Sequence, residues 1–351
     1  MFDRFFKKFS KNVGIDLGTS NTLIYLKDRG IVVSEPSIVA LNDRTGQILA
    51  VGHEAKRMIG KTPSHITISK PLVDGIISDF EVTEKMLKYF IDKTRGENFS
   101  FTSRPRVVVG VPLDVTEVEK KAVEDVVLSA GAREVFLVES VICTAVGARL
   151  PIQDPSGNMV VDIGGGLTQI AVISLSGVVS WRSLKVAGIK LDQDIMEFAR
   201  TEFNLLTGEG IAEDIKKQSS QLKEKEKSIE LKIQGRDLIT GLPKEITTSS
   251  EQIMQSIQRS INSIVEAIKT TIEITPPELV ADIYRRGLIL SGGGSLLAGI
   301  DKAIHLATKI PVKIIEDPLI CSVRGIGLIL EDEQLLKEVA LPSTQDERSP
   351  R

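Results

Sequence analysis

Short runs of Val, Ile and Leu alternate with longer segments in which apolar residues recur every three or four positions. The runs predict buried strands, and the longer segments predict amphipathic helices. The predicted strands cover 13–17, 22–26, 31–33, 37–41, 107–111, 135–138, 159–163, 169–174, 178–181, 288–290 and 312–315. The predicted helices cover 114–130, 192–203, 209–218, 250–272, 296–307 and 319–330. A capping box of Asp114 and Glu117 is expected to open the first helix. This alternation of strand and helix favours an α/β fold.

One sequence motif occurs twice in altered form. It consists of an apolar strand, an Asp, a Gly-rich turn with hydroxyl groups, and a second strand. The first copy runs from Asp16 to Asn21, and the second runs from Asp162 to Thr168. Each Asp ends a predicted strand, where its carboxylate would project into a cleft. Because Mg²⁺ prefers oxygen ligands and keeps several waters, we expect Asp16 and Asp162 to hold Mg²⁺ through water.

Glycine residues in both turns allow backbone N–H groups to approach phosphate oxygens closely. A third Gly run follows the predicted strand 288–290, and we expect a nucleoside to lie against its backbone. The candidate nucleotide-binding residues are Gly18, Thr19, Ser20, Asn21, Gly164, Gly165, Gly166, Thr168, Gly292, Gly293, Gly294 and Ser295. A single Gly-rich turn is more often a tight turn without a ligand. Three of them together predict ATP, or GTP, with Mg²⁺.

Composition excludes several classes of protein. Hydrophobic residues make up 42% of the 351 residues, which is enough to form hydrophobic cores. The net charge of -3 does not indicate nucleic acid as a partner. Cys143 and Cys321 lie far apart, outside any metal-ligand spacing, and are expected to be buried thiols. No apolar run approaches the ~18–20 residues of a membrane-spanning helix. The N-terminus lacks the apolar core of a signal peptide, so a cytoplasmic protein is expected.

The first residues of the chain predict contact with a membrane surface. Four aromatic residues fall on one helical stripe: Phe2, Phe5, Phe6 and Phe9. Four basic residues fall on the opposite side: Arg4, Lys7, Lys8 and Lys11. Such a helix suits a bilayer interface with anionic lipids. The alternative is a helix packed on the protein's own body. Phe99 and Phe101, in a loop between a helix and a strand, are a second candidate contact, or else are tucked into the core.

Several longer motifs point to one family. The stretches that carry the resemblance are Gly14–Tyr25, Ser34–Ala40, Arg104–Pro112, Thr116–Lys120, Gly131–Val135, Glu316–Leu319 and Arg324-Gly325. Together with the three Gly runs, they resemble the actin–Hsp70–sugar kinase superfamily, and within it the MreB family of bacterial actin-like cell-shape proteins. The resemblance covers nearly the whole chain.

The resemblance implies an α/β, actin-like fold of two lobes, each with an RNase H-like core and a smaller outer subdomain. Residues 13–150 would form the first lobe, to which 318–340 return, and 151–317 would form the second. Within the second lobe, the outer subdomain would span about 190–248, a region that includes a stretch rich in Lys and Glu. Residues 1–12 would be the membrane-binding segment and 341–351 a disordered tail. The family also implies that Glu213 and Lys216 flank the ribose and adenine. From the residues alone, a solvated pair between the two is the alternative.

Two departures from the family pattern concern hydrolysis. The family usually has a Glu where Ser140 stands and a Thr where Leu167 stands, and this pair positions the attacking water. Losing such groups commonly costs on the order of 10²–10⁴-fold in rate. We therefore expect a protein that binds ATP but hydrolyses it slowly or not at all. A third departure is Ile189, where the family usually has an Asp.

The resemblance implies membrane-associated filaments that organise cell-wall synthesis and cell shape. The expected partners are other copies of the chain, the anionic inner surface of the cytoplasmic membrane, and membrane proteins of cell shape and wall synthesis. The alternatives are an active ATPase or phosphotransferase of the same fold, or a non-hydrolysing paralogue that co-polymerises with an active one. As an enzyme, the chain would be at most a slow ATPase.

Overall fold

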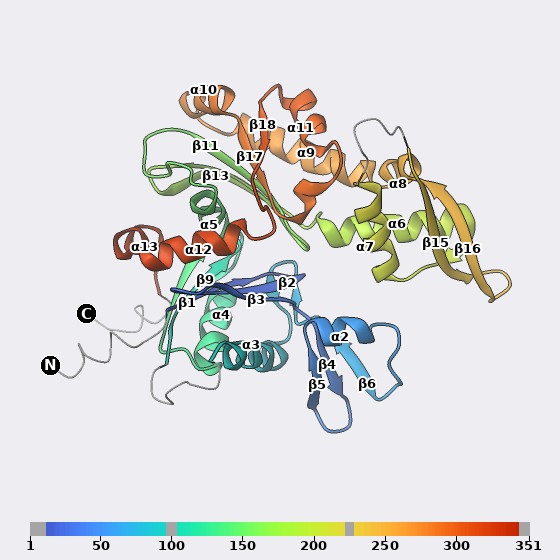
Figure 1. Cartoon of the computed structure of the whole chain (residues 1–351). Coiled ribbons are helices and arrows are strands. Elements are labelled where there is room, and N and C mark those ends of the chain that lie inside the picture. The colour runs from blue at the N-terminus through green and yellow to red at the C-terminus, as the bar shows by residue number, and fades with distance from the viewer. Residues whose placement is uncertain (1–11, 96–103, 222–227, 344–351) are drawn as a thin grey trace.

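The computed structural model describes residues 12–95, 104–221 and 228–343. The six Phe residues predicted to touch a membrane (Phe2, Phe5, Phe6, Phe9, Phe99 and Phe101) lie outside these ranges. Two five-stranded sheets form the centre of the molecule (Figure 1). We call each sheet, with the elements packed on its outer face, the first half and the second half of the structure. No helix among the described residues is long and apolar enough to cross a bilayer.

Both sheets follow one plan. The first sheet has the order β10-β9-β1-β2-β3, and the second has the order β13-β12-β11-β17-β18. In each sheet, the strand that comes first in the sequence pairs antiparallel with the next strand along the chain and parallel with a later one. The strands of the first sheet are β1 (Asn12–Leu17), β2 (Asn21–Leu26), β3 (Gly30–Pro36), β9 (Arg106–Val111) and β10 (Glu134–Glu139). Those of the second are β11 (Asn158–Ile163), β12 (Thr168–Ser174), β13 (Gly177–Leu184), β17 (Leu288–Ser291) and β18 (Val312–Ile314).

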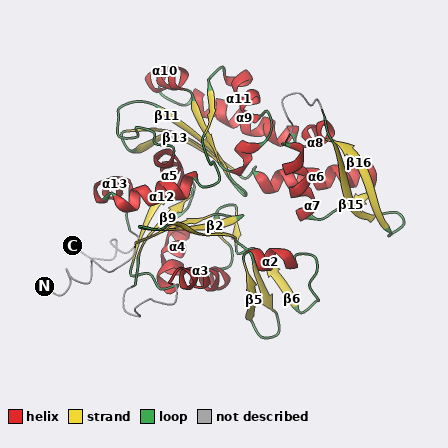
Figure 2. Ribbon diagram, in the orientation of Figure 1, coloured by secondary structure: helices red, strands yellow, loops and turns green. Residues whose placement is uncertain are grey.

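Helices cover both sheets. The central strands are therefore buried on both faces, as their continuous apolar runs predict. The first half carries α3 (Phe80–Arg95) and α4 (Glu117–Ser129) on its outer face (Figure 2). The second half carries α6 (Gly188–Phe203), α7 (Glu209–Ser219), α8 (Ser250–Ser256), α9 (Gln258–Glu273), α10 (Pro277–Arg286) and α11 (Ile300–Thr308). Each half has its own apolar cluster, one around Phe90 and one around Ile195 and Ile264.

Two helices lie between the sheets. α5 (Ser140–Gly147) and α12 (Cys321–Glu331) form an apolar cluster that also takes Val108 from the first sheet and Val160 from the second. α13 (Glu333–Val339) follows α12. Cys143 and Cys321 are free, buried thiols at this place, as expected.

Small peripheral units extend both halves. One contains β4 (Val39–Asn42), β5 (Gln47–Val51), α2 (His53–Met58) and β6 (Ile66–Ser69), followed by the hairpin β7 (Leu72–Val73) and β8 (Ile76–Ile77). The other contains β14 (Leu205–Leu206), β15 (Glu230–Asp237) and β16 (Pro243–Ser249). The strands β15 and β16 project from α6, α7 and α8 in Figure 1. The division of the chain at residue 150 and the outer subdomain at about 190–248 stay predictions.

Three local predictions were wrong. The capping box of α4 is made by Thr116 and Glu119, two residues later than the predicted pair. The helix predicted over 250–272 is two consecutive helices, α8 and α9, with Ile257 between them. The helix predicted from residue 296 begins at Ile300, because a short 3-10 helix, Gly293–Leu296, and a left-handed Gly299 precede it.

Candidate functional site

The first Gly-rich turn joins β1 to β2 and is held by its own backbone and by Ser37. The Gly18 N–H donates to the Asn21 carbonyl at 3.1 Å. The Ser37 hydroxyl donates to the Gly18 carbonyl at 2.6 Å, and the Ser37 N–H donates to the Ser20 carbonyl at 3.0 Å. These bonds fix the turn from outside, and the Thr19 hydroxyl accepts the Gly75 N–H at 2.7 Å.

The second Gly-rich turn joins β11 to β12 and is held by the N-terminus of α6. The Gly164 N–H donates to the Leu167 carbonyl at 2.9 Å, which closes the turn. The N–H groups of Gly188 and Ile189 donate to the carbonyls of Gly164 and Gly165 at 3.1 and 2.8 Å. These N–H groups lie in the first turn of α6, where no intrahelical acceptor is available.

The two turns meet. A Cβ atom on Gly165 would lie 2.0 Å from Ser20 Oγ, and one on Gly166 would lie 2.7 Å from Thr19 Oγ1. Such distances are far below van der Waals contact, so only glycine fits at these positions. The structure therefore brings the two predicted turns face to face, and a phosphate group between them requires the two halves to move apart.

Asp16 and Asp162 lie at the ends of the two central strands, one behind each turn. Burial raises the pKa of Asp16 to about 6, and the Ser322 side chain opposes this shift. Burial also raises the pKa of Asp162 to about 7, and the nearby Asp16 carboxylate adds to the shift. Within the described residues, neither carboxylate forms an ion pair with Lys or Arg. Two neighbouring, partly buried carboxylates without a counter-ion fit a divalent cation.

The described residues contain no group of three or more His, Cys, Asp or Glu that could hold a metal ion by itself. A cation at Asp16 and Asp162 would therefore depend on water or phosphate oxygens for its other ligands. This is the usual mode for Mg²⁺ bound with a nucleotide.

The third Gly run packs against the end of β11, the strand that leads into the second Gly-rich turn. Gly292 has a left-handed backbone with φ of 77°, and a Cβ atom there would lie 2.5 Å from Asp162 Oδ1. A Cβ atom on Gly294 would lie 2.1 Å from Ile163 Cγ2, and the Ser295 hydroxyl donates to the Gly292 carbonyl at 2.7 Å. The run thus stands beside the carboxylate of Asp162, although a 3-10 helix rather than an α-helix follows it.

Glu213 and Lys216 share α7 but are not paired with each other. The Glu213 carboxylate accepts from Lys56 at 2.8 Å and from Lys217 at 2.6 Å. Burial raises the pKa of Glu213, but hydrogen bonds from Lys217 and Lys56 outweigh it and bring the pKa to about 2. The Lys216 ammonium lies 2.7 Å from Asp192 Oδ1 and donates to the Gly188 carbonyl at 2.7 Å. A solvated pair between Glu213 and Lys216 is therefore not what this structure contains.

The two positions linked to hydrolysis lie at different places around the turns. Ser140 begins α5, with its hydroxyl 3.4 Å from where a Cβ on Gly110 would lie. Leu167 is buried, and a Cβ on Gly75 would lie 2.7 Å from Leu167 Cδ1 and 2.8 Å from Pro112 Cγ. Leu167 belongs to the second half, whereas Gly75 and Pro112 belong to the first. The leucine therefore makes an apolar contact between the halves.

Two polar residues, Gln169 and Glu139, lie close in sequence to Leu167 and Ser140. The Gln169 Oε1 atom accepts the Leu113 N–H at 3.0 Å, so this amide links the two halves. Burial raises the pKa of Glu139, and the Lys120 ammonium opposes the shift. Glu139 is the N-cap residue of α5 but makes no side-chain capping bond.

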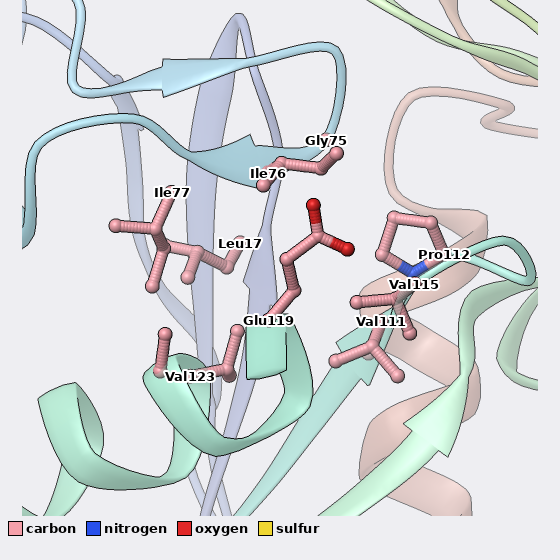
Figure 3. Close-up of a pocket in the computed structure, with 11 residues that line it drawn as sticks. Leu17, Gly75, Ile76, Ile77, Val111, Pro112, Val115, Glu119 and Val123 are labelled. Atoms are coloured by element: carbon pink, nitrogen blue, oxygen red, sulfur yellow. The ribbon is translucent and has the colours of Figure 1, made fainter. Parts of the chain in front are cut away.

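A small pocket lies beside Leu17 and beneath Gly75 (Figure 3). Its lining is apolar except for Glu119, whose carboxylate points toward Gly75 in the figure and also accepts the Thr116 N–H at 2.7 Å. The sequence does not predict this pocket, because its residues come mainly from β1, the β7–β8 hairpin, β9 and α4. Only the capping pattern of Thr116 and Glu119 could have drawn attention to it.

Comparison with known proteins gives a consistent result. A family model described as MreB/Mbl protein matches residues 10–338. A cell shape-determining protein Mbl of Bacillus cereus is 47% identical over 333 residues, covering 95% of this chain and 99% of the relative. A cell shape-determining protein MreB of Escherichia coli is 45% identical over 335 residues, covering 94% of this chain and 96% of the relative.

Solved structures agree with the sequence relatives. MreB5 of Spiroplasma citri bound to ADP superposes with a TM-score of 0.88 at 36% identity, covering 94% of this chain and 98% of that one. The same protein bound to AMPPNP gives a TM-score of 0.88 at 37% identity. A chain of the MamK double helical filament gives 0.75 at 21% identity, a likeness that concerns the fold alone. The actin-like fold class predicted from the sequence is confirmed.

Proposed function

The chain belongs to the MreB/Mbl family, and we propose that it is an ATP-binding, actin-like cytoskeletal protein that polymerises into filaments. The observation that carries the proposal is the meeting of two Gly-rich turns at Ser20 and Gly165, with a partly buried carboxylate behind each. The S. citri relative, whose structures hold ADP and AMPPNP, supports nucleotide binding by this chain.

The turns and carboxylates have separate tasks in this proposal. Backbone N–H groups and hydroxyls of the two turns bind the phosphates, and the third Gly run lies along the nucleoside. Asp16 and Asp162 hold Mg²⁺, which when bound neutralises charge on the phosphates. Because the turns touch in this structure, ATP binding separates the halves slightly and then bridges them. Nucleotide binding can thereby bias the subunit toward the polymer without hydrolysis.

Slow hydrolysis is part of the proposal and rests on Ser140 and Leu167. Neither side chain offers a carboxylate, and Leu167 offers no hydrogen-bonding group at all. Phosphoryl transfer depends mainly on positioning and electrostatics. A double variant, Ser140→Glu with Leu167→Thr, is expected to release phosphate faster than the wild type by on the order of 10²-fold. Equal rates for the two proteins would contradict this account of the two positions.

We also propose that the filaments lie on the inner face of the cytoplasmic membrane, where they organise cell-wall synthesis and cell shape. The pattern of Phe2, Phe5, Phe6 and Phe9 opposite basic residues supports membrane binding, and the family supports the role in shape. Replacing Phe5 and Phe6 with Ser is expected to abolish co-sedimentation with anionic liposomes, because the apolar stripe loses its centre. Liposome binding that survives both substitutions would contradict the amphipathic-helix proposal.

One assay separates this function from its rivals. The full chain is incubated with Mg-ATP and anionic liposomes, and sedimentation and phosphate release are read from the same tube. Pelleting that needs ATP but releases little phosphate is the expected result. Rapid phosphate release together with pelleting would support filament formation and contradict the proposal of slow hydrolysis. Phosphate release without pelleting would favour an active ATPase or phosphotransferase of the same fold.

A further inference from the structure

The Ser322 hydroxyl is a polar group that the fold leaves without a hydrogen bond. Ser322 is the second residue of α12. Its Oγ atom is buried and has no hydrogen-bonding partner among the described residues. Most buried polar groups in folded proteins have a partner, because leaving one unpaired is unfavourable. Either a bound ligand supplies the partner of this hydroxyl, or the group is a local imperfection of packing.

The packing of α12 on β1 places Ser322 over the end of that strand. A Cβ atom on Gly14 would lie 2.6 Å from Ile326 Cγ2, so α12 and β1 are in direct contact here. Ser322 lies four residues before Ile326, on the same face of the helix. Asp16 lies two residues after Gly14, on the same face of the strand. The two steps cover similar lengths, about 6 Å along a helix and about 7 Å along a strand.

Contacts at both ends of α12 fix its direction on the sheet. At its last turn, Glu331 accepts a hydrogen bond from the Tyr25 hydroxyl at 2.8 Å, and Tyr25 is paired with Gly14 across β1 and β2. At its first turn, burial raises the pKa of the Cys321 thiol, and the Asp162 carboxylate adds to the shift. The first turn of α12 therefore lies at the end of β1, beside the two carboxylates.

The Ser322 side chain reaches the carboxylate of Asp16. Burial raises the pKa of Asp16 to about 6, and the contact with Ser322 works against this rise. The contact falls short of a hydrogen bond in length or direction, because the Ser322 Oγ atom has no such partner within the described residues. The unpaired hydroxyl thus lies next to a carboxylate that the proposed function assigns to Mg²⁺.

We propose that Ser322 is a positioning residue of the Mg²⁺ site, whose hydroxyl donates to the Asp16 carboxylate when the cation is bound. The inference rests on the proposed function, because it needs Mg²⁺ at Asp16 and Asp162. A hydroxyl donor fixes the orientation of a carboxylate without neutralising its charge. Supporting hydrogen bonds of this kind commonly change metal affinity by about 10–100-fold. The Ser322 hydroxyl also gains the partner that it lacks.

The test compares nucleotide binding with and without the cation. AMPPNP, whose bridging nitrogen resists hydrolysis, is titrated into the full chain at several free Mg²⁺ concentrations and in EDTA, and isothermal titration calorimetry gives its affinity. We expect Mg²⁺ to tighten binding to the wild type. Ser322→Ala should raise the Mg²⁺ concentration that gives half of this effect by on the order of tenfold. The affinity in EDTA should stay unchanged, because Ser322 acts through the cation alone.

Ser183→Ala is the matched control. The Ser183 Oγ atom is also buried and without a partner among the described residues, but β12 separates its strand, β13, from β11 and Asp162. This variant should keep the Mg²⁺ dependence of the wild type. Ser322→Thr retains a hydroxyl and should keep most of that dependence. Thermal melting without nucleotide checks that each variant is folded. If Ser322→Ala does not fold, Ser322→Cys replaces it, because a thiol is only a weak donor.

Two results would overturn the inference and leave the proposed function intact. One is a Ser322→Ala chain with the Mg²⁺ dependence of the wild type, and the other is an equal loss of affinity with Mg²⁺ and in EDTA, which indicates a general structural role. A wild-type chain that binds AMPPNP equally well with Mg²⁺ and in EDTA would overturn the inference and the metal site, but not nucleotide binding. A wild-type chain that binds no AMPPNP under any condition would overturn both the inference and the proposed function.

Discussion

Among the contacts between the two halves of the molecule, two are built in opposite ways. At the helix contact, α5 and α12 approach so closely that a Cβ on Gly147 would lie 2.0 Å from the Cys321 carbonyl oxygen, and one on Gly325 would lie 1.7 Å from that of Cys143. At the rim contact, Lys56 of α2 pairs with Glu213, and Lys70 pairs with Glu209, both acids lying on α7. The side chains of the rim contact are between 28% and 54% exposed.

The difference indicates how the halves move. Backbone packed on backbone cannot slide without losing many contacts, because folded interiors are close-packed. Exposed ion pairs contribute little and are screened by salt. We therefore expect a motion that opens the space between the two Gly-rich turns to break the rim contact and to pivot at the helix contact. Substitutions at the two places should differ in size accordingly.

The largest effect is expected from Gly325→Ala at the helix contact. The added methyl group meets the Cys143 carbonyl, a backbone atom that cannot rotate away, so α5 and α12 must separate. We expect the free energy of unfolding to fall by about 3 kcal/mol, which is the upper end of the range for adding a group to a well-packed core. Urea unfolding followed by circular dichroism measures it.

Gly210→Ala in α7 is the control for the helix contact. No atom lies within 4 Å of a Cβ at Gly210, so only the helix propensity of the residue changes. That change should stabilise the protein by up to about 1 kcal/mol. If Gly325→Ala unfolded at the same urea concentration as Gly210→Ala, the close approach of the two helices would be refuted.

An intermediate effect is expected at Leu167, which contacts the first half at Gly75. Leu167→Ala removes the apolar group that bridges to Gly75 and Pro112, and we expect a loss of about 2 kcal/mol, at the lower end for buried leucines, since the site lies between movable halves. Leu306→Ala, at a leucine that is 67% exposed on α11, should change stability little. Thermal melting compares the two variants. Equal midpoints would show that Leu167 makes no stabilising contact between the halves.

The sequence was most informative where one segment carries the whole pattern. The strands that end at Asp16 and Asp162 and the turns after them could be predicted, because apolar periodicity and Gly-rich turns are local properties. The exposed hairpin of β15 and β16 was missed, since Lys and Glu dominate the region before it and its apolar positions are few. The partners of Lys216 and Leu167 could not be predicted either. Asp192, Gly75 and Pro112 lie far from them in sequence, and only the fold brings them together.

The smallest effect is expected at the rim contact, where a double-mutant cycle of Lys56→Met and Glu213→Gln should give a coupling of about 0.2–1 kcal/mol. The pKa of Glu213 lies at about 2 instead of its ordinary 4.5, so the ionised carboxylate is favoured in the folded state. Its stabilising contribution is therefore complete above pH 4.5 and is lost as the pH falls from 4.5 toward 2.

The stability difference between the wild type and Glu213→Gln should accordingly shrink between pH 5 and pH 3, and also in 1 M salt, where the Debye length is only about 3 Å. Urea unfolding at each pH and salt concentration measures this difference. A coupling as large as the effect of Gly325→Ala, or one that salt leaves unchanged, would mean that the rim is held as firmly as the helix contact. The halves would then have no side at which to open, and nucleotide entry between the two Gly-rich turns would need a different motion.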